Sequence, residues 1–330
     1  MDVKTFEKLV PDAILNAVEK ALGNKLTALI APLPSYINRV YELRGIDGTK
    51  MVAKFYRPGR WDKDALLDEH RFILDCAEIE IPVVSPLLLQ NGETLDRFDD
   101  IYFALFPKRS GRQLEITEDR DWVRIGSLIA RMHLAGEKRT AVSRVRIDPQ
   151  FSATTDVLHL FSEVIPGAYR QAYRDTAMRI IDSSFPLFEK LEVIRIHGDC
   201  HMGNILDRLE EGLVLIDFDD MAMGPPVQDL WLLLPDRPQQ CTREIDLFLT
   251  GYEQFRHLNR LSLRCIESLR AMRMIYFLSW CSRQRNDFQF RRNFPDWGSD
   301  AFWSKEIHDL REQMGFVLDQ STDSWSDETY

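Results

Sequence analysis

The sequence lacks an excess of basic charge. It has 42 Lys and Arg against 52 Asp and Glu, which gives a formal net charge of −10 at pH 7. Nucleic acids and anionic membranes attract basic surfaces, so bulk binding to either is excluded as the main task of the chain. The stretch "RQRNDFQFRRNF" (283–294) is locally basic with interleaved phenylalanines. In a chain this acidic we interpret it as a solvated helix end or a dock for an acidic substrate, and we expect no nucleic-acid or membrane partner.

Cysteines are few and show no pairing pattern. The five are odd in number and widely spaced, and none forms a CxxC pair. This indicates a reducing compartment rather than a disulfide framework, and it offers no spacing suited to zinc. No basic segment followed by an apolar one opens the chain, so no signal peptide is expected. No run approaches the roughly 18 apolar residues that a membrane span needs. A cytoplasmic location is the expectation.

What is present predicts two lobes. A chain of 330 residues is long enough for about two domains. Its first third alternates strand patterns with one helix, which Asp62 or Asp64 could cap. The expected elements are a hairpin over 39–45 and 50–57, a helix over 62–78, and strands in "IPVVSPLLLQ" (81–90) and "IYFALFPKR" (101–109).

The periodicity becomes helical after a break that contains Pro, Ser and Gly. Strong helices are predicted over 117–137 and 263–284, and the second is apolar enough to be a buried central helix. We therefore place the boundaries as an amino-terminal lobe over 1–106, a hinge over 107–112, a helical lobe over 113–318 and a disordered acidic tail over 319–330.

Residues 194–220, "IRIHGDCHMGNILDRLEEGLVLIDFDD", set polar side chains beside two apolar runs that read as buried strands. Asp199 and Asn204 lie in the loop after the first run, and Asp217 leaves the end of the second. Buried carboxylates need a partner, and hard oxygen ligands suit magnesium together with substrate phosphates. We predict that Asn204 and Asp217 hold Mg²⁺ and that Asp199 accepts the proton of a hydroxyl nucleophile, as phosphoryl transfer requires. Each residue alone could be a cap or turn residue, but the joint pattern favours catalysis.

This segment resembles the catalytic segment of the aminoglycoside phosphotransferase and choline kinase superfamily, whose members are relatives of the protein kinases. In protein kinases the matching loop begins HRD, and Gly198 stands here in the Arg position. The resemblance implies an α+β, bilobal fold with a small antiparallel-sheet lobe that binds ATP and a mostly helical lobe. It also implies that Lys54 pairs with the nucleotide phosphates and that Glu69, on the next helix, holds Lys54, with Asp68 as a competing candidate.

The loop that should cover the phosphates departs from the protein-kinase pattern. "APLPSYINRV" (31–40) has no glycine, and Ser35, Tyr36 and Asn38 occupy its tip. Without glycine the backbone amides approach a phosphate less closely, so weak or slow use of ATP is expected. Ser35 could supply a hydroxyl to a phosphate, or the loop could be a plain turn.

The connector between the lobes should read the adenine edge through backbone groups. By position the candidates are Leu105, Phe106 and Lys108. Pro107 lacks an amide donor, which makes its neighbours the better candidates.

Other polar residues of the segment have open or structural roles. The resemblance makes His197 a loop-bracing residue, whereas His201 could approach phosphate or metal. Asp219 shares the side of Asp217 and could help with a second metal. Asp220 is expected to be solvated or to cap a helix, and we interpret Asp229 as a structural brace of the catalytic loop.

Further blocks narrow the resemblance to a bacterial Ser/Thr protein kinase branch of this superfamily. They include "VAKFYRPGRW", "GPPVQDLWLLL" and "NFPDW". The branch implies a monomer that phosphorylates protein Ser/Thr with ATP and Mg²⁺ during the stress response. Two alternatives remain open: a small-molecule kinase acting on choline, homoserine or an aminoglycoside, and a nucleotide-binding scaffold without turnover, which the glycine-free loop would suit.

Overall fold

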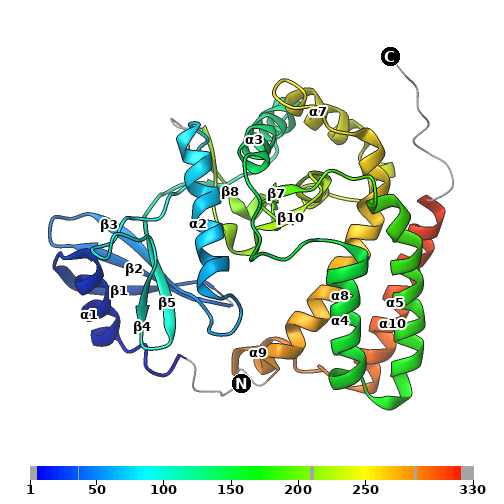
Figure 1. Cartoon of the computed structure of the whole chain (residues 1–330), viewed down its shortest axis with the longest axis horizontal. Helices are drawn as coiled ribbons and strands as arrows, with labels where there is room; N and C mark the ends of the chain where they lie inside the picture. The colour runs from blue at the N-terminus through cyan, green and yellow to red at the C-terminus, as the bar shows by residue number, and fades with distance from the viewer. Residues whose placement is uncertain (1–5, 36, 209–211, 286–287, 321–330) are drawn as a thin grey trace.

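The computed structural model describes residues 6–35, 37–208, 212–285 and 288–320. Two lobes lie side by side, and helix α2 (Lys63–Glu78) stands between the sheet of the first lobe and the helices of the second (Figure 1). The predicted α+β, bilobal architecture is confirmed. Tyr36 and residues 321–330 of the predicted tail lie outside the described residues.

The first lobe is an antiparallel five-stranded sheet in the order β1-β2-β3-β5-β4. Its elements are α1 (Pro11–Leu22), β1 (Leu26–Leu33), β2 (Arg39–Gly45), β3 (Lys50–Phe55), β4 (Asp96–Phe98) and β5 (Ile101–Pro107). The hairpin of β2 and β3 was predicted, and its register pairs Val40 with Lys54. Asp62 caps α2, as its carboxylate accepts a hydrogen bond from the Ala65 amide at 2.8 Å. The alternative cap, Asp64, lies inside the helix.

The predicted strand over 81–90 is wrong. Pro82 and Pro86 have no amide to donate, so this apolar run cannot form a regular ladder. It bonds to two other elements instead: the Leu215 amide donates to the Pro82 carbonyl at 2.9 Å, and the Leu87 amide donates to the Leu105 carbonyl at 2.7 Å. The segment is therefore irregular chain that hydrogen-bonds to a strand of each lobe.

The second lobe is mostly helical, with two small sheets at its centre. Its helices are α3 (Asp119–Glu137), α4 (Thr154–His159), α5 (Gly167–Phe188), α6 (Val227–Trp231), α7 (Thr242–Tyr252), α8 (Ile266–Gln284), α9 (Phe288–Asn293) and α10 (Asp300–Gln320). Its strands are β6 (Arg112–Gln113), β7 (Ile194–Ile196), β8 (Ile205–Arg208), β9 (Gly212–Leu215) and β10 (Ala222–Gly224). Strand β7 pairs with β10, and β8 lies between β6 and β9.

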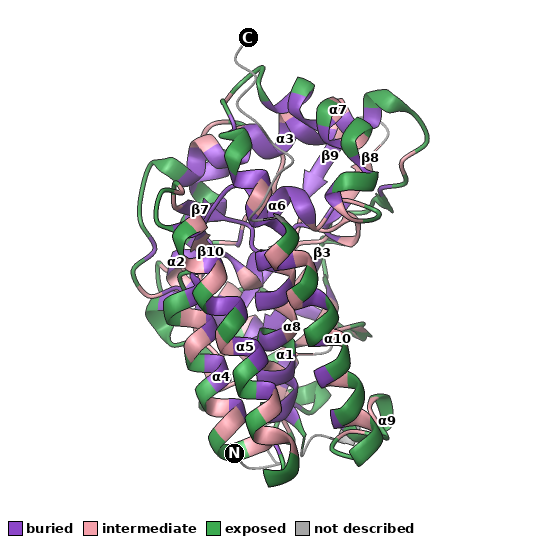
Figure 2. Ribbon diagram, turned by 90° about the vertical axis from the view of Figure 1, so that its right-hand side faces the viewer, coloured by how far each residue is buried: buried purple, intermediate pink, exposed green. Residues whose placement is uncertain are grey.

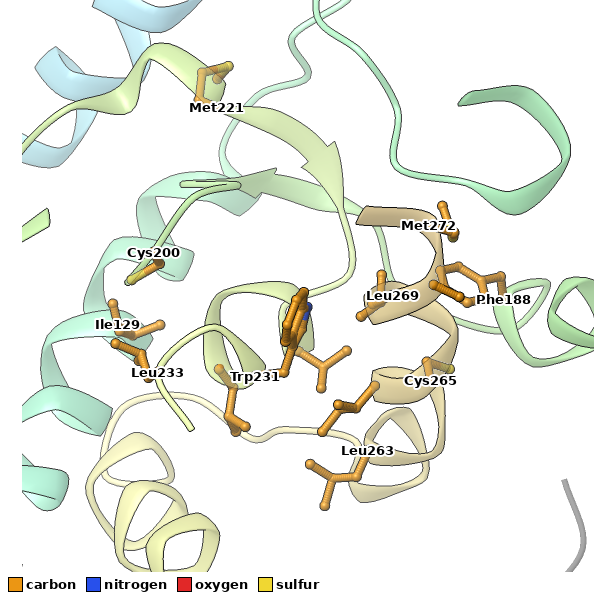
Figure 3. Close-up of a cluster of buried hydrophobic side chains, with 14 of the residues drawn as sticks. Ile129, Phe188, Cys200, Met221, Trp231, Leu233, Leu263, Cys265, Leu269 and Met272 are labelled. Atoms are coloured by element: carbon orange, nitrogen blue, oxygen red, sulfur yellow. The ribbon is translucent and has the colours of Figure 1, made fainter. Parts of the chain in front are cut away.

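One large apolar core fills the second lobe beneath these strands. Trp231, Leu263 and Leu269 belong to it and lie together in Figure 3. Buried residues gather in the middle of the molecule, whereas exposed residues cover the outward faces of α4, α9 and α10 (Figure 2). The small strands therefore rest on a packed base, and the loops after them are held rigidly at the boundary with the first lobe.

Candidate active site

Asp229 anchors the loop that follows β7. Its carboxylate accepts the backbone amides of His197 at 2.8 Å and Gly198 at 2.9 Å, and it also bonds the ring of His133 at 3.0 Å. The His197 ring contacts the carbonyl of Ile216 at 2.9 Å. The expectations that Asp229 and His197 brace the loop are confirmed by these contacts.

Gly198 is required by the path of the same loop. Its φ of +81° lies in the left-handed region, which side chains rarely adopt. A Cβ atom at this position would lie 2.1 Å from the Asp220 carbonyl oxygen. The Arg that protein kinases carry here would not fit.

Asp199 is held by a residue that sequence reasoning missed. Arg273, on α8, donates to Asp199 Oδ1 at 2.7 Å, and His201 Nε2 lies 3.5 Å from Asp199 Oδ2. Burial works to raise the pKa of Asp199, but the contacts with His201 and Arg273 outweigh it and hold that pKa well below its usual range. In turn, the bond to Asp199 raises the pKa of His201. One carboxylate oxygen is thus fixed by a guanidinium, while the other faces a half-exposed imidazole.

Asn204 and Asp217, the two predicted metal ligands, lie in loops that are hydrogen-bonded to each other. The Asn204 amide nitrogen donates to the Asp199 carbonyl at 2.9 Å, and the Ile216 amide donates to the Asn204 carbonyl at 3.0 Å. Asp217 has a φ of +59°, and its side chain is 55% exposed. A non-glycine residue in this conformation is strained, and such strain is found at functional sites.

These residues fit a magnesium ion with few protein ligands. The donors are an amide and a carboxylate oxygen, which are hard ligands. Among the described residues no three His, Cys, Asp or Glu side chains come together as a preformed metal cage. Mg²⁺ usually takes one or two carboxylates and completes its shell with water and substrate phosphates, so this set suits an ion that arrives with a nucleotide.

Lys54 meets the predicted residues across the two lobes. From β3 its Nζ lies 3.0 Å from Asp217, 3.2 Å from Asp219 and 3.6 Å from Glu69. Burial works to lower the pKa of Lys54, but the three carboxylates outweigh it and raise that pKa well above its ordinary value. Asp68, the competing candidate, instead accepts bonds from Arg71 and the Ser143 amide.

Arg144 is a buried arginine that hydrogen-bonds both to Glu69 on α2 and to the loop that contains Asp219. It donates at 2.8 Å to each of three acceptors: the Glu69 carboxylate and the carbonyls of Ala65 and Asp219. Glu69 is therefore hydrogen-bonded by Arg144 more closely than it is paired with Lys54. Burial raises the pKa of Glu69.

Arg60 clamps the two carboxylates that follow Asp217. It pairs with Asp219 and with Asp220, and Asp220 also accepts a bond from Tyr276 on α8 at 3.4 Å. Burial works to raise the pKa of Asp219, but Arg60 and Lys54 outweigh it and hold that pKa far below its usual range. Asp220 is thus an ion-pair partner rather than a solvated residue or a helix cap.

The predicted nucleotide contacts outside this cluster have partners in the first lobe. The Leu105 carbonyl accepts the Leu87 amide, and the Lys108 amide donates to the Lys50 carbonyl at 3.0 Å. Phe106 contacts the ring of His70 edge-on. Ser35 lies half-buried between β1 and β2, whereas Asn38 is buried and accepts the Arg57 amide at 3.1 Å. Contact of Ser35, Leu105, Phe106 or Lys108 with a nucleotide therefore stays a prediction.

Sequence reasoning missed Arg60, Arg144 and Arg273. Arg273 had one usable signal, because an arginine in a helix that otherwise reads as buried needs an acidic partner.

In the part of the chain that the structure describes, no helix is long and apolar enough to cross a membrane.

Comparison with known proteins fits this geometry. Residues 30–264 match the phosphotransferase enzyme family. Stress response kinase A of Shigella flexneri is 35% identical over 94% of this chain and 94% of its own length. The serine/threonine protein kinase RdoA of Salmonella typhimurium is 32% identical over 94% of each chain.

Solved structures share the fold at low sequence identity. Amicoumacin kinase hAmiN, in complex with AMP-PNP, Ca²⁺ and Ami, is 16% identical with a TM-score of 0.75, over 95% of this chain and 96% of that one. A microcompartment-associated aminopropanol kinase is 13% identical with a TM-score of 0.63, over 93% and 94%. The kinases of this family use ATP and a divalent metal. The chain belongs to the phosphotransferase enzyme family and is an ATP-dependent phosphotransferase homologous to stress response kinase A.

Proposed function

We propose that this protein is a Ser/Thr protein kinase that uses ATP and Mg²⁺ in the stress response. The observation that carries the proposal is the convergence of Lys54, Glu69 and Asp217, with Nζ 3.0 Å from Asp217. In protein kinases a lysine paired with a helix glutamate and a metal-binding aspartate must both be in place for phosphoryl transfer, and these three residues match that arrangement. The relatives that span 94% of the chain supply the acceptor class, since they are named as a stress response kinase and a Ser/Thr protein kinase.

In this proposal each residue has one task. Asn204 and Asp217 hold Mg²⁺, which neutralises charge on the transferred phosphoryl group. Lys54 anchors the phosphates, and Glu69 with Arg144 keeps Lys54 in place. Asp199 accepts the proton of the acceptor hydroxyl through the carboxylate oxygen that Arg273 does not occupy.

The remaining assignments follow the lobes. Residues 1–106 bind the nucleotide, 107–112 form the hinge and 113–318 carry the catalytic loop and the metal ligands. The five cysteines are free and buried, which supports a reducing, cytoplasmic location. We assign a monomer.

The test is transfer of label from γ-labelled ATP to a mixed protein acceptor, with choline, homoserine and an aminoglycoside assayed in parallel. We expect phosphoserine or phosphothreonine on protein, loss of transfer when Mg²⁺ is removed, and loss of transfer in Asp199→Asn and Asp217→Ala. The matched control is Asp246→Asn, which changes an exposed carboxylate on α7. Label on a small molecule alone would make the protein a small-molecule kinase, and ATP binding without any transfer would make it a scaffold.

A further inference from the structure

A cavity lies directly beside the catalytic loop. Its volume is about 600 Å³. One wall is made by His201, Met202 and Gly203, the residues that begin two positions after Asp199. His201 Nε2 also lies 3.5 Å from Asp199 Oδ2. A group in the cavity therefore touches the imidazole that contacts the proposed base.

The cavity is separate from the proposed nucleotide site. Lys54 lies on β3, and the residues that meet it come from α2 and from the loop after β9; none of them lines the cavity. The other walls come from the segment after the hinge, from the chain that follows α6, and from the start of α7. Its link to the proposed base is His201, which lines the cavity and lies 3.5 Å from Asp199 Oδ2.

The lining is mainly apolar. Ile116, Leu232 and Leu234 are only partly buried, so they offer apolar surface with room for a partner. Trp122 also lines the cavity, and Glu244 adds a carboxylate to the lining. Such a lining suits an apolar side chain, and the carboxylate disfavours an acidic one.

The volume of the cavity also limits the size of the group that can occupy it. A cavity of about 600 Å³ lies within the range of roughly 300–1,000 Å³ that is usual for small-ligand sites. That is enough room for one large aliphatic or aromatic side chain with part of its backbone. Gln113 and His201 can hydrogen-bond that backbone.

We propose that this cavity binds a large apolar side chain of the acceptor protein, close in sequence to the phosphorylated Ser or Thr. The inference rests on the proposed protein kinase function and names the substrate feature that directs it. The site selects acceptors by burying one apolar residue, and Glu244 rejects an acidic residue at the same position.

The experiment uses the full-length chain and a peptide library. Each peptide has one central Ser, and each flanking position is varied in turn among Ala, Leu, Phe, Lys and Glu. Burial of a Leu or Phe side chain is worth a preference of about tenfold or more in kcat/KM over Ala. We expect one flanking position to show that preference and to disfavour Glu.

Two cavity variants make the result specific. Ile116→Glu should abolish the apolar preference by raising the KM for the peptide, with the kcat and the KM for ATP unchanged. Glu244→Lys should make Glu acceptable at that position. Leu158→Glu, on the exposed face of α4, is the control and should behave as the wild type does.

The outcomes separate the inference from the proposed function. Phosphorylation of peptides with no positional preference, or with a preference that survives Ile116→Glu, would overturn the docking site and leave the kinase assignment standing. Failure of the wild type to phosphorylate any peptide or protein would overturn both.

Discussion

Gly198→Ala is expected to displace the loop that carries Asp199. The added Cβ would lie 2.1 Å from the Asp220 carbonyl oxygen, whereas real Cβ atoms essentially never approach closer than 3.0 Å. Asp229 holds the backbone amides of both His197 and Gly198, so the loop cannot move freely in response. The two loops must separate by about 1 Å, and a misplacement of that size near the reacting groups can reduce the rate about a hundredfold.

The stability effect has two parts that a matched variant separates. An alanine at a φ of +81° costs about 1–2 kcal/mol because of its left-handed backbone conformation. Gly92 has a φ of +76°, and a Cβ added there would have no other atom within 4 Å, so Gly92→Ala carries the same backbone cost without the collision. We expect Gly198→Ala to lose about 1–3 kcal/mol beyond Gly92→Ala, since overpacking adds that much.

The assay is steady-state phosphotransfer together with denaturant unfolding of both variants. Gly92→Ala should keep wild-type kcat despite its lower stability, and Gly198→Ala should lose about a hundredfold in kcat. If Gly198→Ala retains activity within about threefold of Gly92→Ala, the loop tolerates the shift and the argument from rigid anchoring is refuted.

Three further predictions follow from the buried charges. Arg144→Met should destabilise the fold by about 3–5 kcal/mol, because it leaves a buried carboxylate without its hydrogen-bonded cation, and denaturant unfolding against Arg120→Met, which breaks an exposed pair with Glu118, measures the difference. His70 is buried, and burial lowers its pKa to about 3. Below about pH 6.5 this residue gains a proton in the unfolded chain but not in the folded chain. The free energy of unfolding should therefore fall by about 2 kcal/mol between pH 7 and pH 5 because of this group, and His70→Gln should not show that loss. Arg273→Gln should lower kcat about tenfold by releasing one oxygen of Asp199, and Arg273→Lys should recover part of it; equal kcat in both variants and the wild type would contradict the positioning role.

The sequence predicted elements where local signals were strong. Helix α2 had both apolar periodicity and an Asp cap, and the hairpin of β2 and β3 had a Gly-containing turn between two alternating runs. The run over 81–90 was misread because its apolar residues pack on the separate cores of the two lobes, while its prolines rule out a ladder. Periodicity alone could not tell these two uses of apolar residues apart.

For the site, the sequence carried motifs but no long-range partners. Asp199, Asn204 and Asp217 stand close together in one segment, so their types and spacing were visible. Arg144 bonds Glu69 across 75 positions of the chain, and Arg273 bonds Asp199 across 74. The sequence does not show which residues pair, because only the packing of segments far apart in the chain brings them together.

The acidic residues after β9 differ in the cations with which they pair, and this difference gives them different roles. Asp219 is buried and paired with Arg60 as well as Lys54, so Arg60 still links it to the first lobe when Lys54 engages another group. Asp217 is half exposed, and Lys54 is its partner at 3.0 Å. Under the proposed function Lys54 would pair with the phosphates of the nucleotide, and Asp217 would then be a ligand of the divalent cation rather than the partner of Lys54. A nucleotide alone would take Lys54 and leave the charge of Asp217 without its partner. A divalent cation alone would meet the like charge of Lys54 at close range. Both situations are costly in a partly buried site. Nucleotide and metal therefore favour each other's binding, because together they replace both halves of one ion pair at once.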